Sequence, residues 1–349
     1  MRRTATTRFG LTGLLALTCL ALSAPANATF EGDNGRIAFR RFLGLDRSSG
    51  AIFTVRSDGT HEFQVTHPGT GVVDQDPDVS PDGRRIVFQR GGETMDDVFV
   101  VNSDGTGLRQ LTSTAFPEGN CLPDGGECNG TPAWSPDGRW IVFNRAFGPV
   151  VDDVVETQAL FVMRPDGTHV RQVTQLHSPA TGDTGQDSAP QFSPDGTRLL
   201  FQRRNVRTAT PEGALALWVL DLRTGAERRI TPYDLQAGDT PDWSPDGKNI
   251  LFHDNNDTPQ GNANLYTVRP DGSHLKQLTF VGDGITRYLG SSFSPDGKSI
   301  VVGKRPSTGG PELNTADVVV MRANGTGERL VTRTELYDSF PDWGPAIAR

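Results

Sequence analysis

Residues 241–248 read Pro-Asp-Trp-Ser-Pro-Asp-Gly-Lys, and the tetrapeptide Ser-Pro-Asp-Gly within this stretch occurs five times in the chain. In this tetrapeptide the proline presets φ for the second position of a turn, and the glycine can adopt a positive φ at the fourth. Each copy therefore predicts a tight turn, and we interpret its aspartate as a turn residue. The copies begin at Ser80, Ser135, Ser193, Ser244 and Ser294. A repeat of roughly 50 residues is typical of propellers and related arrays.

Strand-like segments surround the copies of the motif. Around the second copy, Pro132-Ala133-Trp134 precedes the motif and an apolar run at 140–143 follows it. A further pair of segments is seen at 97–101 and 108–112, separated by the turn Ser103-Asp104-Gly105. Runs rich in Val, Ile and Phe that alternate or are wholly apolar are characteristic of β-strands. Each repeat is thus predicted to form four antiparallel strands, A to D, joined as a meander.

The two ends of the sequence complete the number of repeats. Residues 34–39 match strand B of a repeat that lacks its strand A, and residues 340–344 match a strand A with no strand B after it. The C-terminal strand is therefore expected to complete the N-terminal repeat, which closes a ring and removes open sheet edges. The sequence predicts an all-β fold, a six-bladed β-propeller with four antiparallel strands per blade.

These motifs resemble the propeller of the TolB-like family, whose repeats are also described as WD40-like or PD40. The resemblance rests on Pro241–Lys248, on the apolar strand and Asp-Gly turn that follow, and on the closing Leu-Thr pairs at 111–112 and 278–279. It covers nearly all of residues 30–345. TolB itself has an α/β domain before its propeller, whereas here we expect the propeller to follow the leader directly.

The first 28 residues have the features of a secretory leader. Three arginines lie within the first eight residues, residues 9–22 are apolar, and Ala26-Asn27-Ala28 is a small-x-small cleavage signal. The apolar run is too short for a membrane-spanning helix, and no later segment reaches that length. We expect a signal peptide at 1–28, a single propeller domain at 29–349, and a periplasmic or extracellular location. Lipidation at Cys19 is the alternative to cleavage after Ala28.

Charge and cysteine content narrow the expected partners. The formal net charge is −8, and loss of a leader with three arginines and no acidic residue would make it more negative. This charge argues against nucleic acid and anionic membranes as partners. Two cysteines remain after the leader, and in an exported protein Cys121 and Cys128 are expected to form a disulfide that closes a surface loop. No metal or cofactor is predicted, and we expect a monomer.

The connections between strands indicate where a ligand would bind. In a four-stranded meander the A–B and C–D turns lie on one face of the ring, here called the turn face. The B–C and D–A connections lie on the opposite face, here called the loop-rich face, and they are long and varied, as at 144–158 and 202–215. Loops on a rigid scaffold are where binding sites concentrate. The loop-rich face is therefore the expected binding face.

Charged residues recur opposite each other near the loop-rich ends of strands A and B. Three blades carry an aspartate and an arginine there, which predicts cross-strand ion pairs with a structural role. The pairs are Asp74 with Arg90, Asp187 with Arg203, and Asp338 with Arg41. The other blades break this pattern and supply candidate ligand-binding residues. These are Arg145, opposite Asn129, in blade 3, Asp239, His253 and Asp254 in blade 5, and Arg287, Tyr288, Lys304 and Arg305 in blade 6.

The sequence contains no familiar catalytic motif. It lacks the Gly-x-Ser-x-Gly elbow of the peptidases that carry a similar propeller beside a hydrolase domain, and it lacks His-Glu-x-x-His. We therefore expect a non-catalytic scaffold that binds a protein, a peptide or a cell-wall glycan on the loop-rich face. The alternative is a metal-dependent enzyme of the lyase or lactonase type, with carboxylates and His253 converging at the mouth of the channel. A purely structural module is a third interpretation.

Overall fold

The computed structural model describes ten segments of the chain, and the statements that follow concern these segments alone. They are residues 32–92, 95–113, 127–151, 154–175, 185–205, 214–238, 240–254, 263–283, 286–305 and 315–347. The predicted leader at 1–28, Cys121 and Asp239 lie outside the described residues.

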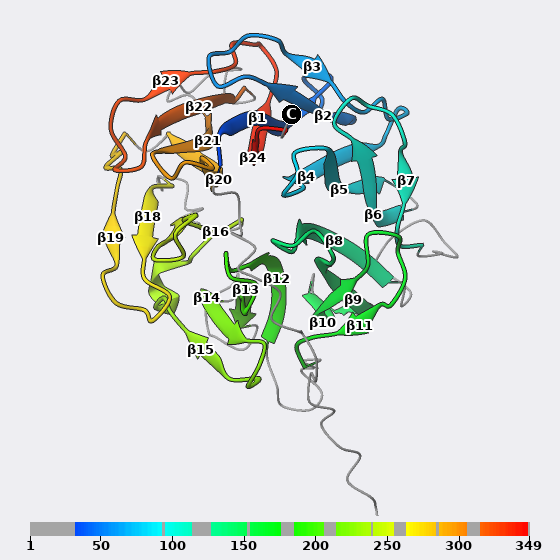
Figure 1. Cartoon of the computed structure of the whole chain (residues 1–349), viewed down its shortest axis with the longest axis vertical. Coiled ribbons are helices and arrows are strands. Elements are labelled where there is room, and N and C mark those ends of the chain that lie inside the picture. The colour runs from blue at the N-terminus through cyan, green and yellow to red at the C-terminus, as the bar shows by residue number, and fades with distance from the viewer. Residues whose placement is uncertain are drawn as a thin grey trace, which may run out of the picture.

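The described strands form a ring of four-stranded units around a central axis (Figure 1). Blade 1 consists of β24 (Asp338–Pro345), β1 (Asn34–Phe42), β2 (Gly50–Val55) and β3 (Phe63–Gln64). Blade 2 consists of β4 (Val73–Val79), β5 (Arg85–Gly92), β6 (Met95–Asn102) and β7 (Arg109–Gln110). Blade 3 consists of β8 (Glu127–Trp134), β9 (Ile141–Val151), β10 (Val154–Met163) and β11 (Arg171–Gln172).

The second half of the ring repeats this order. Blade 4 consists of β12 (Gly185–Phe192), β13 (Arg198–Asn205), β14 (Ala214–Asp221) and β15 (Glu227–Arg229). Blade 5 consists of β16 (Asp242–Trp243), β17 (Ile250–His253), β18 (Leu265–Val268) and β19 (Lys276–Gln277), and the short 3₁₀ helix η2 (Tyr233–Leu235) precedes it. Blade 6 consists of β20 (Arg287–Phe293), β21 (Ser299–Arg305), β22 (Asp317–Arg322) and β23 (Arg329–Leu330).

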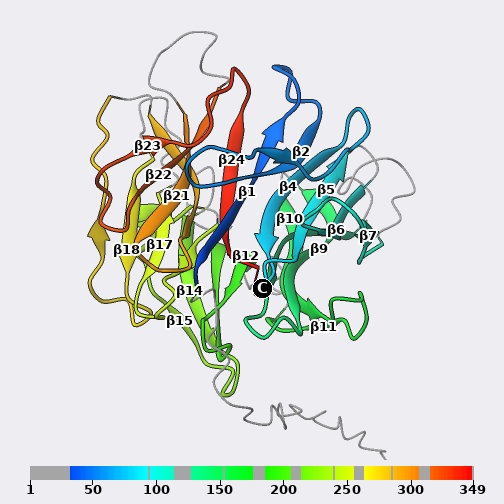
Figure 2. The ribbon, with the colours of Figure 1, turned by 45° about the horizontal axis from the view of Figure 1, so that its top comes forward.

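The pairing within the blades confirms the predicted all-β propeller. Successive strands of each blade pair antiparallel, and β24 pairs with β1, so the C-terminal strand completes the N-terminal blade as expected. Figure 2 shows these two strands side by side. A single parallel bridge between Gly50 and Val73 joins blades 1 and 2 into one eight-stranded sheet.

The Ser-Pro-Asp-Gly segments form the expected A–B turns. In the turn at Ser244, the serine hydroxyl donates to Asp246 Oδ1 at 2.7 Å and accepts the backbone N–H of Asn249 at 2.9 Å. Asp246 Oδ1 also accepts the N–H of Lys248, and Gly247 has a φ of +67° that favours glycine. The other four copies repeat the serine–aspartate bond. The aspartates are therefore turn residues, as predicted.

In every blade, a buried threonine after strand D accepts a hydrogen bond from a backbone N–H of strand C. In blade 4, Thr231 Oγ1 accepts the backbone N–H of Leu217 at 2.8 Å, at a point where strand D no longer provides a backbone acceptor. The same bond is made in the other blades by Thr66, Thr112, Thr174, Thr279 and Thr332. The Leu-Thr pairs noted in the sequence thus satisfy a buried backbone donor that would otherwise be costly.

The hydrophobic core is divided into six clusters, one between each pair of neighbouring blades. In each cluster the last apolar residue of an inner strand packs against strands B and C of the preceding blade. Trp134, Trp243 and Trp343 fill this position in blades 3, 5 and 1, and Val79, Phe192 and Phe293 fill it in blades 2, 4 and 6. The blades are therefore held together mainly by apolar packing. Within the described segments, no helix combines the length and apolar character needed to cross a membrane.

Replacing a strand D threonine should destabilise the ring through its hydroxyl. We expect Thr231→Val to lower the free energy of unfolding by about 1–3 kcal/mol, because the N–H of Leu217 stays buried without an acceptor. Thr231→Ser keeps the acceptor and should cost less. Urea unfolding of the two variants is the measurement, and a valine variant that matches or exceeds the serine variant in stability would contradict this role.

Candidate functional site

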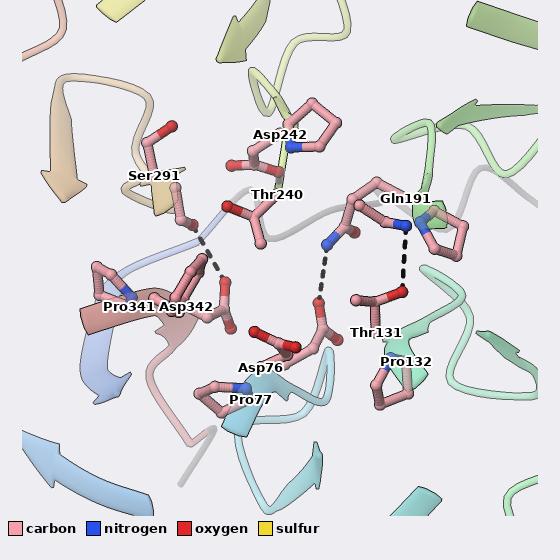
Figure 3. A pocket seen from close by; sticks show the side chains of 16 residues that line it. Asp76, Pro77, Thr131, Pro132, Gln191, Thr240, Asp242, Ser291, Pro341 and Asp342 are labelled. Carbon is pink, nitrogen blue, oxygen red and sulfur yellow. Dashed lines mark hydrogen bonds between the residues drawn. The ribbon is translucent and has the colours of Figure 1, made fainter. Parts of the chain in front are cut away.

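The inner strands of all six blades enclose a small cavity in the central channel (Figure 3). Its volume is about 50 Å³. Equivalent tripeptides line it in four blades, namely 76–78, 189–191, 240–242 and 340–342, while Thr131 and Pro132 line it in blade 3 and Ser291 and Ser292 in blade 6. Figure 3 shows side chains from every inner strand around this space. A cavity of this size accommodates water-sized groups, whereas small-molecule sites usually offer roughly 300 Å³ or more.

A bulge turns the inner strands toward the cavity. The register with strand B shifts there in blades 2, 3, 4 and 6, for example between Gln75 and Asp78. The residue at the bulge has a positive φ, as in Asp76 at +49° and Thr240 at +51°. A proline follows in five of the blades, and because proline has no N–H, the bulge leaves no donor unsatisfied there. Blade 6 uses Gly290, where a Cβ would approach the Cα of Phe340 to 2.8 Å.

Three carboxylates beside the cavity bind the backbone of the following blade. Asp78 accepts the N–H of Trp134 at 2.9 Å. The N–H of Phe293 donates to Asp242 at 2.7 Å, and the N–H of Val79 donates to Asp342 at 2.8 Å. Each bond joins the inner strands of adjacent blades. These carboxylates therefore link neighbouring blades and also provide polar groups in the channel.

Burial makes the same carboxyl groups poor acids. Loss of hydration raises the pKa of Asp242 to about 7 and that of Asp342 to about 6, and it raises the pKa of Asp78 well above its usual range. The charge of Asp342 contributes to the rise at both Asp78 and Asp242. Polar side chains partly offset the burial, since Ser292 donates to Asp342 at 3.1 Å and Gln191 to Asp78 at 3.4 Å. The channel thus holds carboxyl groups that gain or lose protons near neutral pH.

Sequence reasoning missed these three aspartates, although the repeat contains a signal for them. Each lies two residues before the serine of the turn motif or its C-terminal counterpart, at a position filled by Ala133, Gln191 and Ser292 in the other blades. Comparing the repeats position by position would have shown three acids at one equivalent position of strand A. The opposite charges at the loop-rich ends of the strands are more conspicuous in the sequence.

The predicted cross-strand pairs lie together at the loop-rich ends of the strands. Arg90 Nε lies 2.6 Å from Asp74 Oδ1, Arg203 Nε lies 2.6 Å from Asp187 Oδ1, and Arg41 Nε lies 2.7 Å from Asp338 Oδ1. Each guanidinium forms a second bond to the other oxygen of the same carboxylate. All three aspartates are fully buried. The bidentate geometry and the burial make these pairs part of the blade interior.

In two of these pairs the arginine also contacts aromatic rings and a second acid. We call the site of such an arginine, with the side chain opposite it and the flanking rings, a socket. The Arg41 guanidinium lies over Phe39 and Phe53 at 5.3 and 4.7 Å and also binds Glu62 of strand D. Arg203 lies over Phe201 and Trp218 in the same way and binds Glu227 at 2.7 Å. The acids outweigh burial and raise the pKa of Arg203 and Arg41 above the ordinary value. Both arginines are charged at any physiological pH.

In blade 3 an asparagine takes the position of the aspartate. Arg145 Nε donates to Asn129 Oδ1 at 2.7 Å, and its guanidinium lies over Phe143 and Phe161. The amide of Asn129 donates in turn to Asp97 of blade 2 at 3.2 Å. Arg145 is thus bound through a neutral amide, whereas its counterparts bind an aspartate directly.

The candidate residues of blade 5 lie largely inside the wall. His253 is 3% exposed and Asp254 is 7% exposed. Asp254 accepts the backbone N–H of Asn264 at 2.5 Å, and burial raises its pKa. The strand pairing at this end joins Ala237 with Asp254. Asp239, which we predicted opposite His253, lies outside the described residues.

The candidates of blade 6 form a polar group at the edge of strands β20 and β21. Tyr288 pairs with Lys304, and Arg287 pairs with Arg305. Tyr288 is only 4% exposed, and its hydroxyl donates to Glu328 at 2.8 Å, while Lys304 Nζ lies 2.7 Å from the same carboxylate. Burial, followed by the charge of Glu328, raises the pKa of Tyr288. The structure therefore places Tyr288 in the wall and the three cations at its half-buried rim.

Two further sequence predictions concern a disulfide and a metal. Cys128 lies in β8, but Cys121 is outside the described residues, so their disulfide stays a prediction. Within the described segments, no group of three or more His, Cys, Asp or Glu side chains is arranged to hold a metal ion.

Comparison with known proteins adds the evolutionary context. Residues 172–348 match the PD40 family model, described as "TolB beta propeller domain". The chain is 31% identical over 228 residues to a TolB homolog of Chlorobium luteolum, covering 55% of this chain and 47% of that protein. It is 32% identical over 113 residues to the uncharacterized peptidase YuxL of Bacillus subtilis, covering 32% of this chain and 16% of that protein. The chain thus spans less than half the length of either relative.

A solved structure shares the fold. The crystal structure of TolB from Acinetobacter baumannii superimposes with a TM-score of 0.66 at 18% identity, covering 90% of this chain and 68% of that one. At this identity the likeness concerns the fold alone.

The partly buried channel carboxyl of Asp242 should make stability depend on pH. Its pKa is higher in the folded than in the unfolded chain, so its contribution is fully present below about pH 4 and is lost as the pH rises through about 7. Asp242→Asn keeps an oxygen for the N–H of Phe293 without a charge. We expect this variant to gain stability relative to wild type between pH 5 and pH 8, by at least about 1 kcal/mol. Urea unfolding at both pH values measures this gain.

Asp246→Asn provides the control for that experiment. Asp246 lies in the exposed turn four residues further on, and the Ser244 hydroxyl with Lys248 lowers its pKa, so it is ionised throughout this range. Its effect on stability should be the same at pH 5 and pH 8. An equal pH dependence of the two variants would show that Asp242 is not the titrating group.

Removing a socket arginine should leave a buried carboxylate uncompensated. We expect Arg203→Ala to lower the free energy of unfolding by about 3–5 kcal/mol. Arg145→Ala removes a similarly stacked guanidinium from opposite Asn129 instead of an aspartate, and should cost less than Arg203→Ala. Thermal or urea unfolding compares the two, and equal losses would mean that aromatic stacking, not the ion pair, carries the stabilisation.

Proposed function

The chain belongs to the TolB β-propeller (PD40) family, and from this premise we propose that it is an exported, non-catalytic module that binds a protein or peptide on its loop-rich face. Export rests on the leader predicted at residues 1–28. The partner is recognised by apolar side chains on that face, supported by the rigid strand ends beneath them.

The central channel favours binding over catalysis. Its cavity of about 50 Å³ has no room for a small-molecule substrate. Three of the four acids that line it, Asp78, Asp242 and Asp342, are each engaged with the backbone of the next blade, so their positions serve the ring first. The peptidase relative matches this chain over only 16% of its own length, so its printed activity concerns a much longer protein.

The observation that carries the proposal is the exposure of Phe280. This residue follows Thr279, whose hydroxyl caps the start of β18, and it therefore lies on the loop-rich side of blade 5. Its side chain is 78% exposed, the highest value among the exposed large apolar residues that the structure describes. Leu45, on the same face in blade 1, is 63% exposed. Exposed aromatic side chains on a firm support are typical anchors of protein interfaces.

The strand ends of three blades on this face, including blade 1 below Leu45, are well suited to hold a binding surface in place. Three bidentate ion pairs fix the inner strand to its neighbour at this end in blades 1, 2 and 4. Loops that leave such fixed ends lose less conformational entropy on binding than loops on mobile supports. The predicted pairs therefore support recognition indirectly, as structural elements.

A peptide selection tests the proposal. Residues 29–349 are immobilised, peptides are selected from a displayed library, and the dissociation constant of a selected peptide is measured by calorimetry. Phe280→Ser should weaken binding at least tenfold, because an interface anchor is worth more than about 1.4 kcal/mol.

Leu275→Ser is the matched control. Leu275 is 42% exposed and flanks the opposite end of the same strand, β19, on the turn face. Its replacement should change the dissociation constant less than twofold. Selected peptides that bind equally well to both variants, or that lose affinity only with Leu275→Ser, would place the binding surface elsewhere. Binding that requires a metal ion and disappears with chelator would favour the enzyme alternative.

A further inference from the structure

The turn face carries two equivalent clusters of cations between blades, and we propose that they are binding grooves for a phosphate-rich polyanion. Groove 2/3 is formed by Arg85 and Arg109 of blade 2 with Arg139 and Arg164 of blade 3. Groove 4/5 contains the equivalent residues of the next blade pair, Arg198, Arg228, Lys248 and Arg269. This proposal concerns the face opposite to the one assigned to a protein partner and is independent of it.

The first cation of each groove is fixed against a tryptophan of the next blade. The guanidinium of Arg85 lies 4.6 Å from the ring centroid of Trp134, and that of Arg198 lies 4.8 Å from Trp243. Both arginines occupy the same position of the repeat, because the backbone N–H of each binds the serine hydroxyl of its turn motif. Stacking orients the planar guanidinium and leaves its edge available for a bidentate oxyanion.

The second cation reaches across the junction from the outer strand. Arg109 Nη2 donates to the carbonyl oxygen of Pro165 at 2.5 Å, and Arg228 Nη1 donates to the carbonyl oxygen of Asp271 at 3.4 Å. A carbonyl oxygen neutralises no charge, so each arginine brings a full positive charge to the junction. This contact also sets the width of the groove, because it ties strand D of one blade to the C–D turn of the next.

The third and fourth cations come from exposed turns of the next blade. Arg139 and Lys248 follow the glycine of the A–B turn, and Arg164 and Arg269 directly follow strand C. Groove 2/3 has a volume of about 280 Å³ and is lined by these four arginines with Pro165 and one acid, Asp166. The Asp166 carboxylate accepts both the hydroxyl and the N–H of Thr168. Asp137 also lies 4.0 Å from Arg139, and in groove 4/5 Asp246 lies 3.0 Å from Lys248 and Asp195 lies 3.9 Å from Arg198. The four cations of groove 2/3 still outnumber the acids beside them, on a chain whose net charge is −8.

The remaining junctions lack the complete set. Between blades 5 and 6, Asn249 stands at the position of the stacked arginine, although Lys298 and Arg322 keep the two exposed cations. Between blades 6 and 1, Ser299 takes the stacked position, while Arg329 still reaches the carbonyl oxygen of Ser57. The full four-cation groove therefore occurs where a stacked arginine and an exposed turn cation coincide. A diffuse positive face would not follow this rule.

Phosphate fits these grooves better than a carboxylate-bearing ligand of lower charge density. An arginine pair can bind one phosphate through parallel N–H donors, and two grooves on one face allow a chain of phosphates to bind at both. Calorimetric titration with inorganic tripolyphosphate at about 0.1 M salt, where distant charges are screened beyond about 10 Å, is the test. We expect two sites per chain.

Matched variants separate a groove from general charge. Arg139→Gln combined with Arg164→Gln should weaken one of the two sites at least tenfold and leave the other intact. Lys248→Gln with Arg269→Gln should do the same to the other site. Lys298→Gln with Arg322→Gln removes equal charge from equivalent positions at an incomplete junction and should change either site less than twofold. All six side chains are exposed, and melting temperatures confirm that the variants fold.

Three outcomes would overturn the proposal. Equal weakening by all the double variants would show diffuse electrostatic attraction. Absence of heat with tripolyphosphate at this salt concentration would show that the grooves do not bind phosphate. Binding to vesicles of anionic phospholipid without binding to tripolyphosphate would identify a membrane surface as the ligand and exclude a soluble polyanion.

Discussion

The pairing of β24 with β1 is the contact on which the rest of the molecule depends. Every apolar cluster lies between two blades, so no blade can bury its inner apolar residue without a preceding neighbour. In an open array, inner apolar residues between two blades, such as Val79, would stay covered. The apolar face of the blade at the end of the array would be exposed. Closure supplies the missing neighbour, because Trp343 of the last strand packs on blade 6 while belonging to blade 1. The stability of the ring is thus a property of the whole chain.

The sequence predicts the fold well because the fold is encoded in local turn chemistry that recurs. A serine, proline, aspartate and glycine in order specify the A–B turn, and the structure shows each of them in that role. The cross-strand charges could be placed as well, since counting outward from a fixed turn gives the opposing residues of a hairpin. The count reaches Asp187 and Arg203, which the structure pairs, even though the register shifts between Ser188 and Gln191.

The channel could not be derived in the same way. Which side of an inner strand faces the axis depends on a bulge at a residue of positive φ before a proline, a conformation that the sequence alone disfavours. Burial was equally hidden, since His253 and Tyr288 look like surface residues in a loop-rich context but lie inside the wall. The ring therefore contains two kinds of acid: those at the rim, each paired with a guanidinium group, and Asp78, Asp242 and Asp342 in the channel, which accept bonds from backbone N–H groups and neutral polar side chains.

The closing strand pair also fixes how the molecule is oriented relative to anything attached to it. Asn34 at the start of β1 lies opposite Pro345 at the end of β24, so both described ends of the chain leave the ring side by side on the turn face. A polypeptide or anchor continuing from either end would be attached to the ring on its turn face. The loop-rich face would then point outward, away from the attachment, and the cationic grooves would face toward it.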